Sequence, residues 1–298
     1  MTLAASGSVA HLAPGRAVLL CADDFAISSA VSAGIEEAAA AGRLSSTSAF
    51  ATFPEWPGEA KRLAALRDKV AIGLHLNFTV GAPLRPMPSL APTGAFPHMS
   101  DLVGRSLRRA IIPAEIEAET FRQLTRFAEH VGYAPDYLDG HQHAHALPGI
   151  GQAVLAGLKR FEADRWSMMV RDPGDSLARI FSRGRFVKKA LKLAWLVTGF
   201  GAKARQSGHP VNIGFSGHSH YMTDSPYERE MEASFAATGP RHLMMCHPGY
   251  ADDLLATRDW VTVRRTQELH GLLRAEGLTQ RLWRPDRDKA DLWADWRA

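Results

Sequence analysis

The chain has 298 residues, of which 46% are hydrophobic and 22% charged, so it is long enough for one large core and within the usual size of a single α/β barrel. Its formal net charge of +4 is mild, and we expect no nucleic-acid footprint, which would need a dense basic stripe. No apolar run reaches the length of a membrane span, so we expect no transmembrane helix.

The N-terminal residues are small and polar, without the basic start of a signal peptide. We expect residues 1–15 to be a disordered leader and residues 16–298 to form a single domain. Cys21 and Cys246 are the only cysteines, and both lie inside apolar runs. This pattern indicates reduced, buried thiols in a cytoplasmic protein.

Short apolar runs alternate with stretches of helical periodicity along most of the chain. We expect strands at residues 17–25, 45–52, 70–76, 137–138, 166–170, 211–215 and 243–246. We expect helices at residues 28–41, 60–67, 113–131, 149–161, 226–237 and 261–273. This alternation predicts an α/β fold, and about seven strands favour a single TIM-barrel-like (β/α) barrel over a short open sheet.

Three further segments stand out from this alternation. Residues 83–97 are rich in proline and too long for a plain connection, so we expect a loop over a site. Residues 177–203 are the most basic part of the chain, and apolar residues are interleaved with the basic ones. Such a segment can bind membranes or nucleic acid, but a crossover helix with a solvated basic face is the favoured interpretation. The tail holds Trp283, Trp293 and Trp296, which we expect to pack against the body.

The first apolar strand ends in two adjacent carboxylates, Asp23 and Asp24. Neighbouring acids repel each other, and each is costly to bury unless a cation or a proton neutralises it. An aspartate at a strand end can also start a turn or cap a helix. Two of them after a fully apolar strand favour another hypothesis, in which a metal ligand lies beside a general base.

His75, His141 and His247 also follow apolar strands. The carboxyl ends of parallel strands open onto one face of a barrel, so we expect these side chains to converge with the two aspartates. The segment 139–145 can present three imidazoles on one side if it stays extended, although we do not expect all three to bind metal. The loop 217–220, which holds His218 and His220, is interpreted as non-catalytic.

One carboxylate and two imidazoles leave positions on a metal open for water and substrate. A bound metal lowers the pKa of water and polarises a carbonyl oxygen. The second carboxylate then serves as a general base, and a histidine across the site serves as a general acid. This set of groups predicts hydrolysis of an amide or an ester.

Four motifs resemble the ordered signatures of the YdjC-like carbohydrate deacetylases: Ala22–Phe25, Ile72–His75, Leu138–His145 and Cys246–Tyr250. This family includes the bacterial chitooligosaccharide (diacetylchitobiose) deacetylases and the hopanoid-biosynthesis-associated deacetylases. The resemblance runs from about residue 16 to residue 278. It implies a deacetylase-type (β/α) barrel, a divalent metal, removal of acetyl from an N-acetylated sugar, and a homodimer.

Residue by residue, the resemblance implies that Asp24, His75 and His141 bind the metal. It also implies that Asp23 is the catalytic base and His247 the acid. Family members are associated with magnesium, whereas two imidazoles favour zinc or another transition ion. As substrate contacts we consider four residues: Arg171, Tyr250, His143 and His145. Arg171 would hold a sugar hydroxyl or a phosphate, with a surface salt bridge as its alternative, and Tyr250 would either donate to the oxyanion or pack.

The sequence departs from the family pattern at a few positions. Cys21 stands where asparagine is usual, Ala26 replaces a glycine, and Gly140 and Gln142 differ in the central motif. No proposed ligand is lost, but the identity of the sugar stays open. An amidohydrolase-like barrel is the rival enzyme class, although its usual His-x-His pair on the first strand is replaced here by the two aspartates. A non-catalytic sugar- or metal-binding barrel is the third hypothesis. Metal binding alone would not need a second carboxylate, so the presence of Asp23 argues against it.

Overall fold

The computed structural model describes residues 9–162, 168–221 and 225–297. Its centre is a sheet of seven strands in the order β5-β4-β3-β2-β1-β7-β6, and all the neighbouring pairs are parallel. The strands are β1 (Val18–Phe25), β2 (Ser46–Ala49), β3 (Ala71–Leu76), β4 (Tyr137–Gly140), β5 (Met169–Val170), β6 (Phe215–Ser216) and β7 (His242–Cys246). The predicted α/β class and the parallel strands are confirmed.

The prediction of a TIM-barrel-like barrel is confirmed only in part: the sheet is curled like a barrel, but the described residues form no continuous ladder between its edge strands β5 and β6. Among the described residues, the backbone pairing across this gap is limited to an isolated bridge between Val170 and Val211. Beyond that bridge, the side-chain amide of Asn212 takes the place of ladder hydrogen bonds. Its Oδ1 accepts from the backbone N–H of Asp172 (2.7 Å), and its Nδ2 donates to the carbonyl of Asp172 (2.8 Å). Gly214, with φ of 119°, then turns the chain toward β6.

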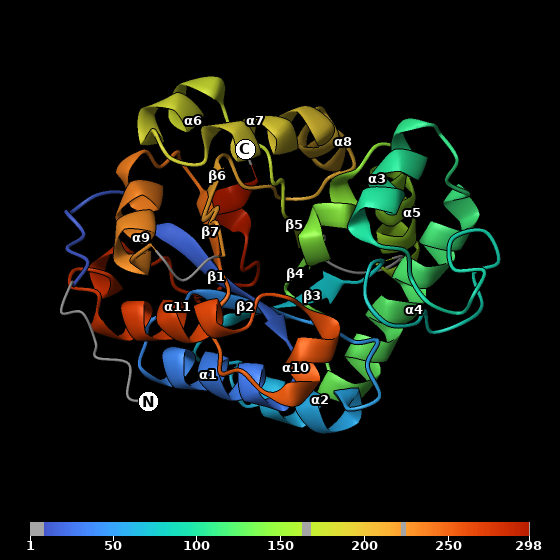
Figure 1. Cartoon of the computed structure of the whole chain (residues 1–298), viewed down its shortest axis with the longest axis horizontal. Helices are drawn as coiled ribbons and strands as arrows, with labels where there is room; N and C mark the ends of the chain where they lie inside the picture. The colour runs from blue at the N-terminus through green and yellow to red at the C-terminus, as the bar shows by residue number, and fades with distance from the viewer. Residues whose placement is uncertain (1–8, 163–167, 222–224, 298) are drawn as a thin grey trace.

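Helices surround the curled sheet (Figure 1). They are α1 (Ser29–Ala40), α2 (Trp56–Ala64), α3 (Met99–Leu107), α4 (Pro113–Val131), α5 (Ile150–Phe161), α6 (Leu177–Arg183), α7 (Val187–Leu196), α8 (Phe200–Gln206), α9 (Tyr227–Ala236), α10 (Asp253–Arg258) and α11 (Val263–Arg274). The predicted helix at 113–131 has the bounds of α4, which ends at Gly132 in a left-handed conformation. The basic segment forms three short helices, α6 to α8, rather than one crossover helix. The helices α3 and α10 were not predicted from the sequence.

The inside of the sheet is filled below its carboxyl end. Leu19 and Cys21 of β1 contact a cluster that includes Tyr137, Trp293 and Trp296. Trp283 stacks on Trp293 with ring centroids 5.0 Å apart, so the predicted packing of the tail is confirmed. Gly73 makes room for this cluster, because a Cβ at that position would lie 2.4 Å from the Tyr137 ring. This cluster does not extend to the carboxyl end of the sheet, where Asp24, His75 and His247 line a cavity.

The described part of the expected leader contacts the body of the protein. Ala10 and Leu12 are buried, and both form backbone hydrogen bonds with Glu276. Residues 1–8, and residues 166 and 167 of an expected strand, lie outside the described residues. Within the described ranges, none of the helices combines the length and the apolar character that crossing a membrane would need.

Candidate metal centre

The site begins where β1 ends. Asp23 and Asp24 are both buried, and Asp24 adopts a left-handed conformation with φ of 74°. A non-glycine residue in this region is strained, and such strain is tolerated where the surrounding structure holds it. Ala26, two residues later, is also left-handed with φ of 67°. This conformation gives a physical reason for the glycine that the family pattern has at that position.

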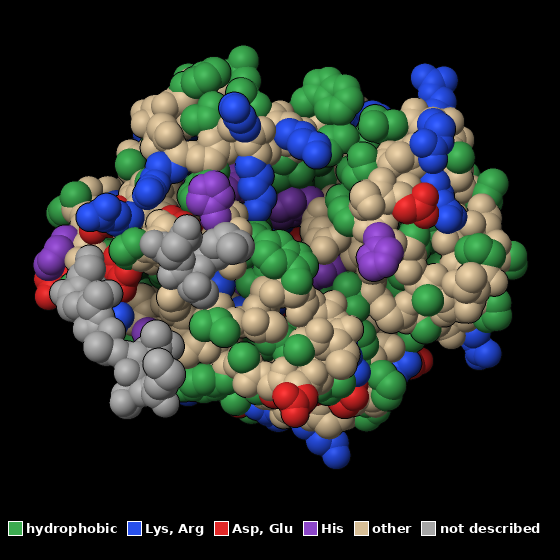
Figure 2. Space-filling model, in the orientation of Figure 1, with side chains coloured by type: hydrophobic (Ala, Val, Ile, Leu, Met, Phe, Trp, Pro, Cys, Tyr) green, Lys and Arg blue, Asp and Glu red, His purple; other side chains and the backbone are tan. Residues whose placement is uncertain are grey.

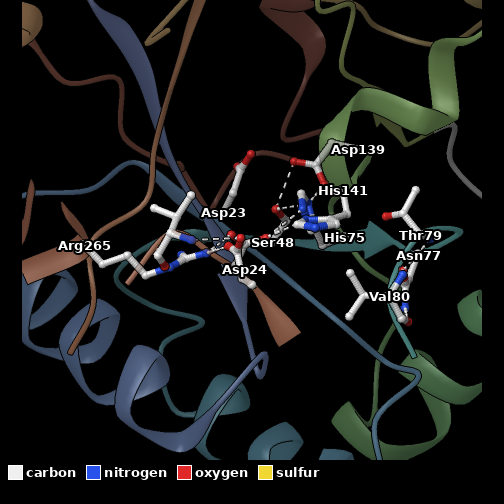
Figure 3. Close-up of polar contacts among 12 residues, drawn as sticks. Asp23, Asp24, Ser48, His75, Asn77, Thr79, Val80, Asp139, His141 and Arg265 are labelled. Carbon is white, nitrogen blue, oxygen red and sulfur yellow. Dashed lines mark hydrogen bonds and ion pairs between the residues drawn. The ribbon is translucent and has the colours of Figure 1, made fainter. Parts of the chain in front are cut away.

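The structure brings Asp24, His75 and His141 together (Figure 3). Nε2 of His75 and Nδ1 of His141 each lie 3.1 Å from the same oxygen, Oδ1 of Asp24. One ligand atom from each residue falls within 4.8 Å of the others. Nε2 of His141 is buried without a hydrogen-bond partner. A buried carboxylate and two imidazoles with unused nitrogen capacity fit a divalent cation.

Asp139 orients His75. Its Oδ1 lies 2.7 Å from Nδ1 of His75, and its Oδ2 accepts from the Ser48 hydroxyl at 2.9 Å. A hydrogen bond from Nδ1 to a carboxylate fixes the tautomer that leaves Nε2 free to bind a cation. Without a cation, burial alone would lower the pKa of His75, but the Asp139 carboxylate outweighs it and raises that pKa to about 10; a cation bound at Nε2 would take the place of the proton on that nitrogen. Asp139 lies inside the motif Leu138–His145, but its role in orienting His75 was not predicted from the sequence.

Arg265 of α11 neutralises Asp24 from the other side (Figure 3). Its guanidinium lies 2.7 Å from Oδ2 of Asp24 and also pairs with Asp259. Burial would raise the pKa of Asp24, but Arg265 and His141 hold it well below its usual range. Oδ2 is therefore occupied by the arginine, and Oδ1 faces the two imidazoles. No local motif in the sequence points to Arg265.

Asp23 is held by Arg171. The guanidinium makes two parallel hydrogen bonds to the Asp23 carboxylate, at 2.7 and 2.6 Å, and also contacts Asp139. Although burial acts in the opposite direction, Arg171 keeps the pKa of Asp23 below its usual range. Asp23 is thus charged and fixed in orientation, and it lines the same cavity as Asp24, His75 and His141.

These groups open into a cavity of about 580 Å³ at the carboxyl end of the sheet. Figure 2 shows this hollow, with histidine side chains visible inside it. All five groups that were predicted to converge contribute to its lining: Asp23, Asp24, His75, His141 and His247. Nδ1 of His247 is buried without a hydrogen-bond partner. His218, from the loop interpreted as non-catalytic, also lines the cavity, and burial lowers its pKa to about 3.

Three of the four residues considered as substrate contacts lie outside the lining of this cavity. Arg171 is fully buried in its pairs with Asp23 and Asp139, so neither the substrate contact nor the surface salt bridge describes its position. His145 is buried, with Nε2 lying 2.9 Å from the carbonyl of Arg171. The hydroxyl of Tyr250 donates to Glu37 at the surface. The fourth residue, His143, lines the cavity, and burial keeps its pKa well below the usual value.

The segment 139–145 is not extended, so the condition under which it could present three imidazoles on one side is not met. Gln142 and His143 are both left-handed, with φ of 52° and 62°, and they divide the short helical stretch His141–Ala146. His141 therefore faces Asp24, whereas His145 packs edge-on against Phe200. Gly140 permits this arrangement, because a Cβ there would lie 2.9 Å from the His145 ring.

Comparison with known proteins gives relatives of consistent description. The chain is 28% identical over 277 residues to the chitooligosaccharide deacetylase of Salmonella typhi, which covers 91% of this chain and 97% of that protein. It is 31% identical over 153 residues to the carbohydrate deacetylase of Mus musculus, covering 50% of this chain and 49% of that protein. It is also 31% identical over 140 residues to the chitooligosaccharide deacetylase of Enterobacter sp. (strain 638), covering 45% and 52%. The matches to the mouse and Enterobacter proteins thus span about half the length of each.

A solved structure shows the same fold. It is that of a candidate cellobiose-phosphate cleavage protein of Enterococcus faecalis, with a TM-score of 0.65 and 21% sequence identity over 87% of this chain and 91% of that one. The model of the family described as YdjC-like protein matches residues 17–280, which is most of the chain. The chain therefore belongs to the YdjC-like family.

Proposed function

We propose that this protein is a metal-dependent hydrolase that removes acetyl groups from an N-acetylated carbohydrate. The observation that carries the proposal is the convergence of Asp24, His75 and His141 beside the charged Asp23, in one cavity. Relatives described as chitooligosaccharide and carbohydrate deacetylases support the substrate class. A chitooligosaccharide or a related glycoside fits this description.

Asp24, His75 and His141 would hold one divalent cation. Magnesium is favoured by the family resemblance, and zinc or another transition ion by the two imidazoles. When bound, the cation supplies a lowered pKa for water and polarisation of the acetyl carbonyl. Asp139 and Arg265 serve this set by fixing the His75 ring and by occupying the second oxygen of Asp24.

Asp23 would accept the proton of the attacking water as the general base. It is ionised at neutral pH, and its two hydrogen bonds to Arg171 prevent the carboxylate from turning away. We therefore assign positioning roles to Arg171 and, through the Arg171 carbonyl, to His145. His143 remains the candidate substrate contact on the cavity wall.

His247 would protonate the leaving amine as the general acid. Its backbone N–H donates to Glu268 at 2.6 Å, which anchors the residue at the end of β7. Its ring lies 5.2 Å from that of Tyr221, edge to face, and its Nδ1 has no partner among the described residues. An imidazole with an unused nitrogen in the cavity is suited to proton transfer. We further propose a cytoplasmic location and a homodimer.

Acetate release tests the proposal. Purified protein, first stripped with a chelator and then reloaded with magnesium or zinc, is assayed on a panel of N-acetylglucosamine oligomers and other acetylated glycosides. We expect release only after reloading, with the chelated protein still folded by circular dichroism. Release from no member of the panel by cation-loaded protein would contradict the proposal, and so would unchanged release by fully stripped protein.

A further inference from the structure

The three helices α6, α7 and α8 form a surface with an unusual concentration of positive charge. The chain between Ser176 and Tyr221 contains eight lysines and arginines and no aspartate or glutamate. Since the whole chain carries only +4, the remainder is net negative. Positive charge is therefore concentrated in one segment rather than spread over the surface.

Most of these charges have no acidic partner. Arg179 and Arg183 pair with Asp175 at the start of α6. The other basic side chains of the segment form no ion pair among the described residues, and most are exposed: Arg185, Lys188, Lys189, Lys192, Lys203 and Arg205. Such a set attracts an anionic surface.

Large apolar side chains are exposed on the same three helices. Leu177 is 60% exposed, Phe181 59% and Trp195 65%. The helices are nevertheless anchored, because Ile180, Ala190 and other apolar residues on them are buried against the body. Figure 2 shows apolar and basic side chains gathered together over α6–α8, directly above the hollow. Aromatic residues with basic neighbours are typical of segments that lie in a membrane interface.

We propose that the α6–α8 surface, defined by Leu177, Phe181, Arg185, Lys188, Trp195 and Lys203, docks onto a bilayer that contains anionic phospholipid. The basic side chains complement the lipid headgroups, and the exposed aromatic and aliphatic side chains enter the boundary between headgroups and acyl chains. Nucleic acid would account for the charge but would leave Leu177 and Phe181 exposed to water. The lipid surface accounts for both features.

Docking would place the mouth of the cavity at the membrane. Lys192, Leu193 and Leu196 of α7 line the cavity from the helix that carries Trp195. Trp260, which lines the cavity from the segment before α11, is 64% exposed. The docking surface is thus continuous with the rim of the site.

Vesicle flotation tests the inference without depending on enzymatic activity. The full chain is floated with vesicles of phosphatidylcholine alone and of phosphatidylcholine mixed with phosphatidylglycerol, at low and at high salt. A charge variant combines Arg185→Gln, Lys188→Gln and Lys203→Gln, and an apolar variant combines Phe181→Ser and Trp195→Ser. A matched control combines Lys61→Gln, Lys69→Gln and Lys159→Gln, which removes three exposed charges from other parts of the surface.

We expect binding to the mixed vesicles that weakens at high salt, and much weaker binding to phosphatidylcholine alone. The charge variant should lose affinity on the order of 100-fold, since each basic residue near an anionic surface contributes about a factor of five. The apolar variant should also lose affinity, the control should bind like the wild type, and hydrolysis of soluble substrate should be unchanged in all three. Three results would overturn the inference: no flotation, equal binding to both kinds of vesicle, or equal losses in the charge variant and the control. Tight binding to duplex DNA without vesicle binding would instead assign the surface to nucleic acid.

Discussion

Replacing Asp139 by asparagine tests how His75 is oriented, because the variant keeps the His75 side chain but removes the carboxylate that orients it. The substitution keeps the size of the side chain but removes the charge that faces Nδ1 of His75 at 2.7 Å. An amide can present either an oxygen or an NH₂ group, so the tautomer with Nε2 free is no longer enforced. Loss of an outer partner of this kind typically reduces metal affinity 10–100-fold, and we expect a decrease of about that size.

The same substitution has a second effect, on stability. Asp139 is one of two carboxylates that neutralise the buried guanidinium of Arg171. Removing one partner of a buried ion pair costs about 3–5 kcal/mol when the other partner is left without an opposite charge. Asp23 still neutralises Arg171 in this variant, so we expect a loss of stability toward the lower end of that range. The free energy of unfolding of the cation-free protein, measured in urea, gives this value separately from the metal affinity.

Isothermal titration of the chelated, folded variant with zinc and with magnesium measures the affinity. Asp136→Asn is a matched control, because Asp136 pairs with Arg287 outside the cavity lining. We expect the control to lose stability but to keep its metal affinity. Folded Asp139→Asn protein that binds the cation as tightly as the wild type would refute the positioning role of Asp139.

Two further predictions concern stability. Gly140→Ala should cost about 1–3 kcal/mol, because the added Cβ meets the His145 ring, whereas Gly58→Ala, at a position with open space around it, should not destabilise; urea denaturation distinguishes them. Burial raises the pKa of Asp172 to about 6, so the stability that comes from its protonated form is present below about pH 4 and is lost as the pH rises through 6. Between about pH 4 and pH 7 the free energy of unfolding of the wild type should therefore fall by about 1–2 kcal/mol more than that of Asp172→Asn. Equal decreases in urea titrations at the two pH values would contradict the raised pKa of Asp172.

The sequence predicted those parts of the site that follow from strand ends. Apolar runs that stop at Asp24, His75 and His247 identify the strands, and parallel strands expose their carboxyl ends on one side. This rule needs no knowledge of how the helices pack. For that reason the convergence of these groups was predictable from one sequence.

The remaining features depend on contacts between distant segments. Arg265 lies on a helix without any local motif, and only the packing of α11 brings it to Asp24. Arg171 follows a strand, as a substrate contact would, but its burial between two carboxylates is a property of the assembled interior. The left-handed residues Gln142 and His143 carry no glycine signal, so the turn that separates His141 from His145 was not predictable. The open edge of the sheet was not predictable for a similar reason, because it depends on a contact between distant segments: the side chain of Asn212 replaces ladder hydrogen bonds beside Asp172.

The two carboxylates at the end of β1 have different proposed roles, Asp24 as a cation ligand and Asp23 as the general base. This difference is tested most directly by measuring bound cation and acetate release together in Asp23→Asn, with Asp24→Asn as the comparison. We predict that Asp23→Asn retains a stoichiometric cation and loses at least about 100-fold in turnover, whereas Asp24→Asn loses the cation itself. An Asp23→Asn protein that loses its cation, or one that retains both cation and turnover, would contradict the account.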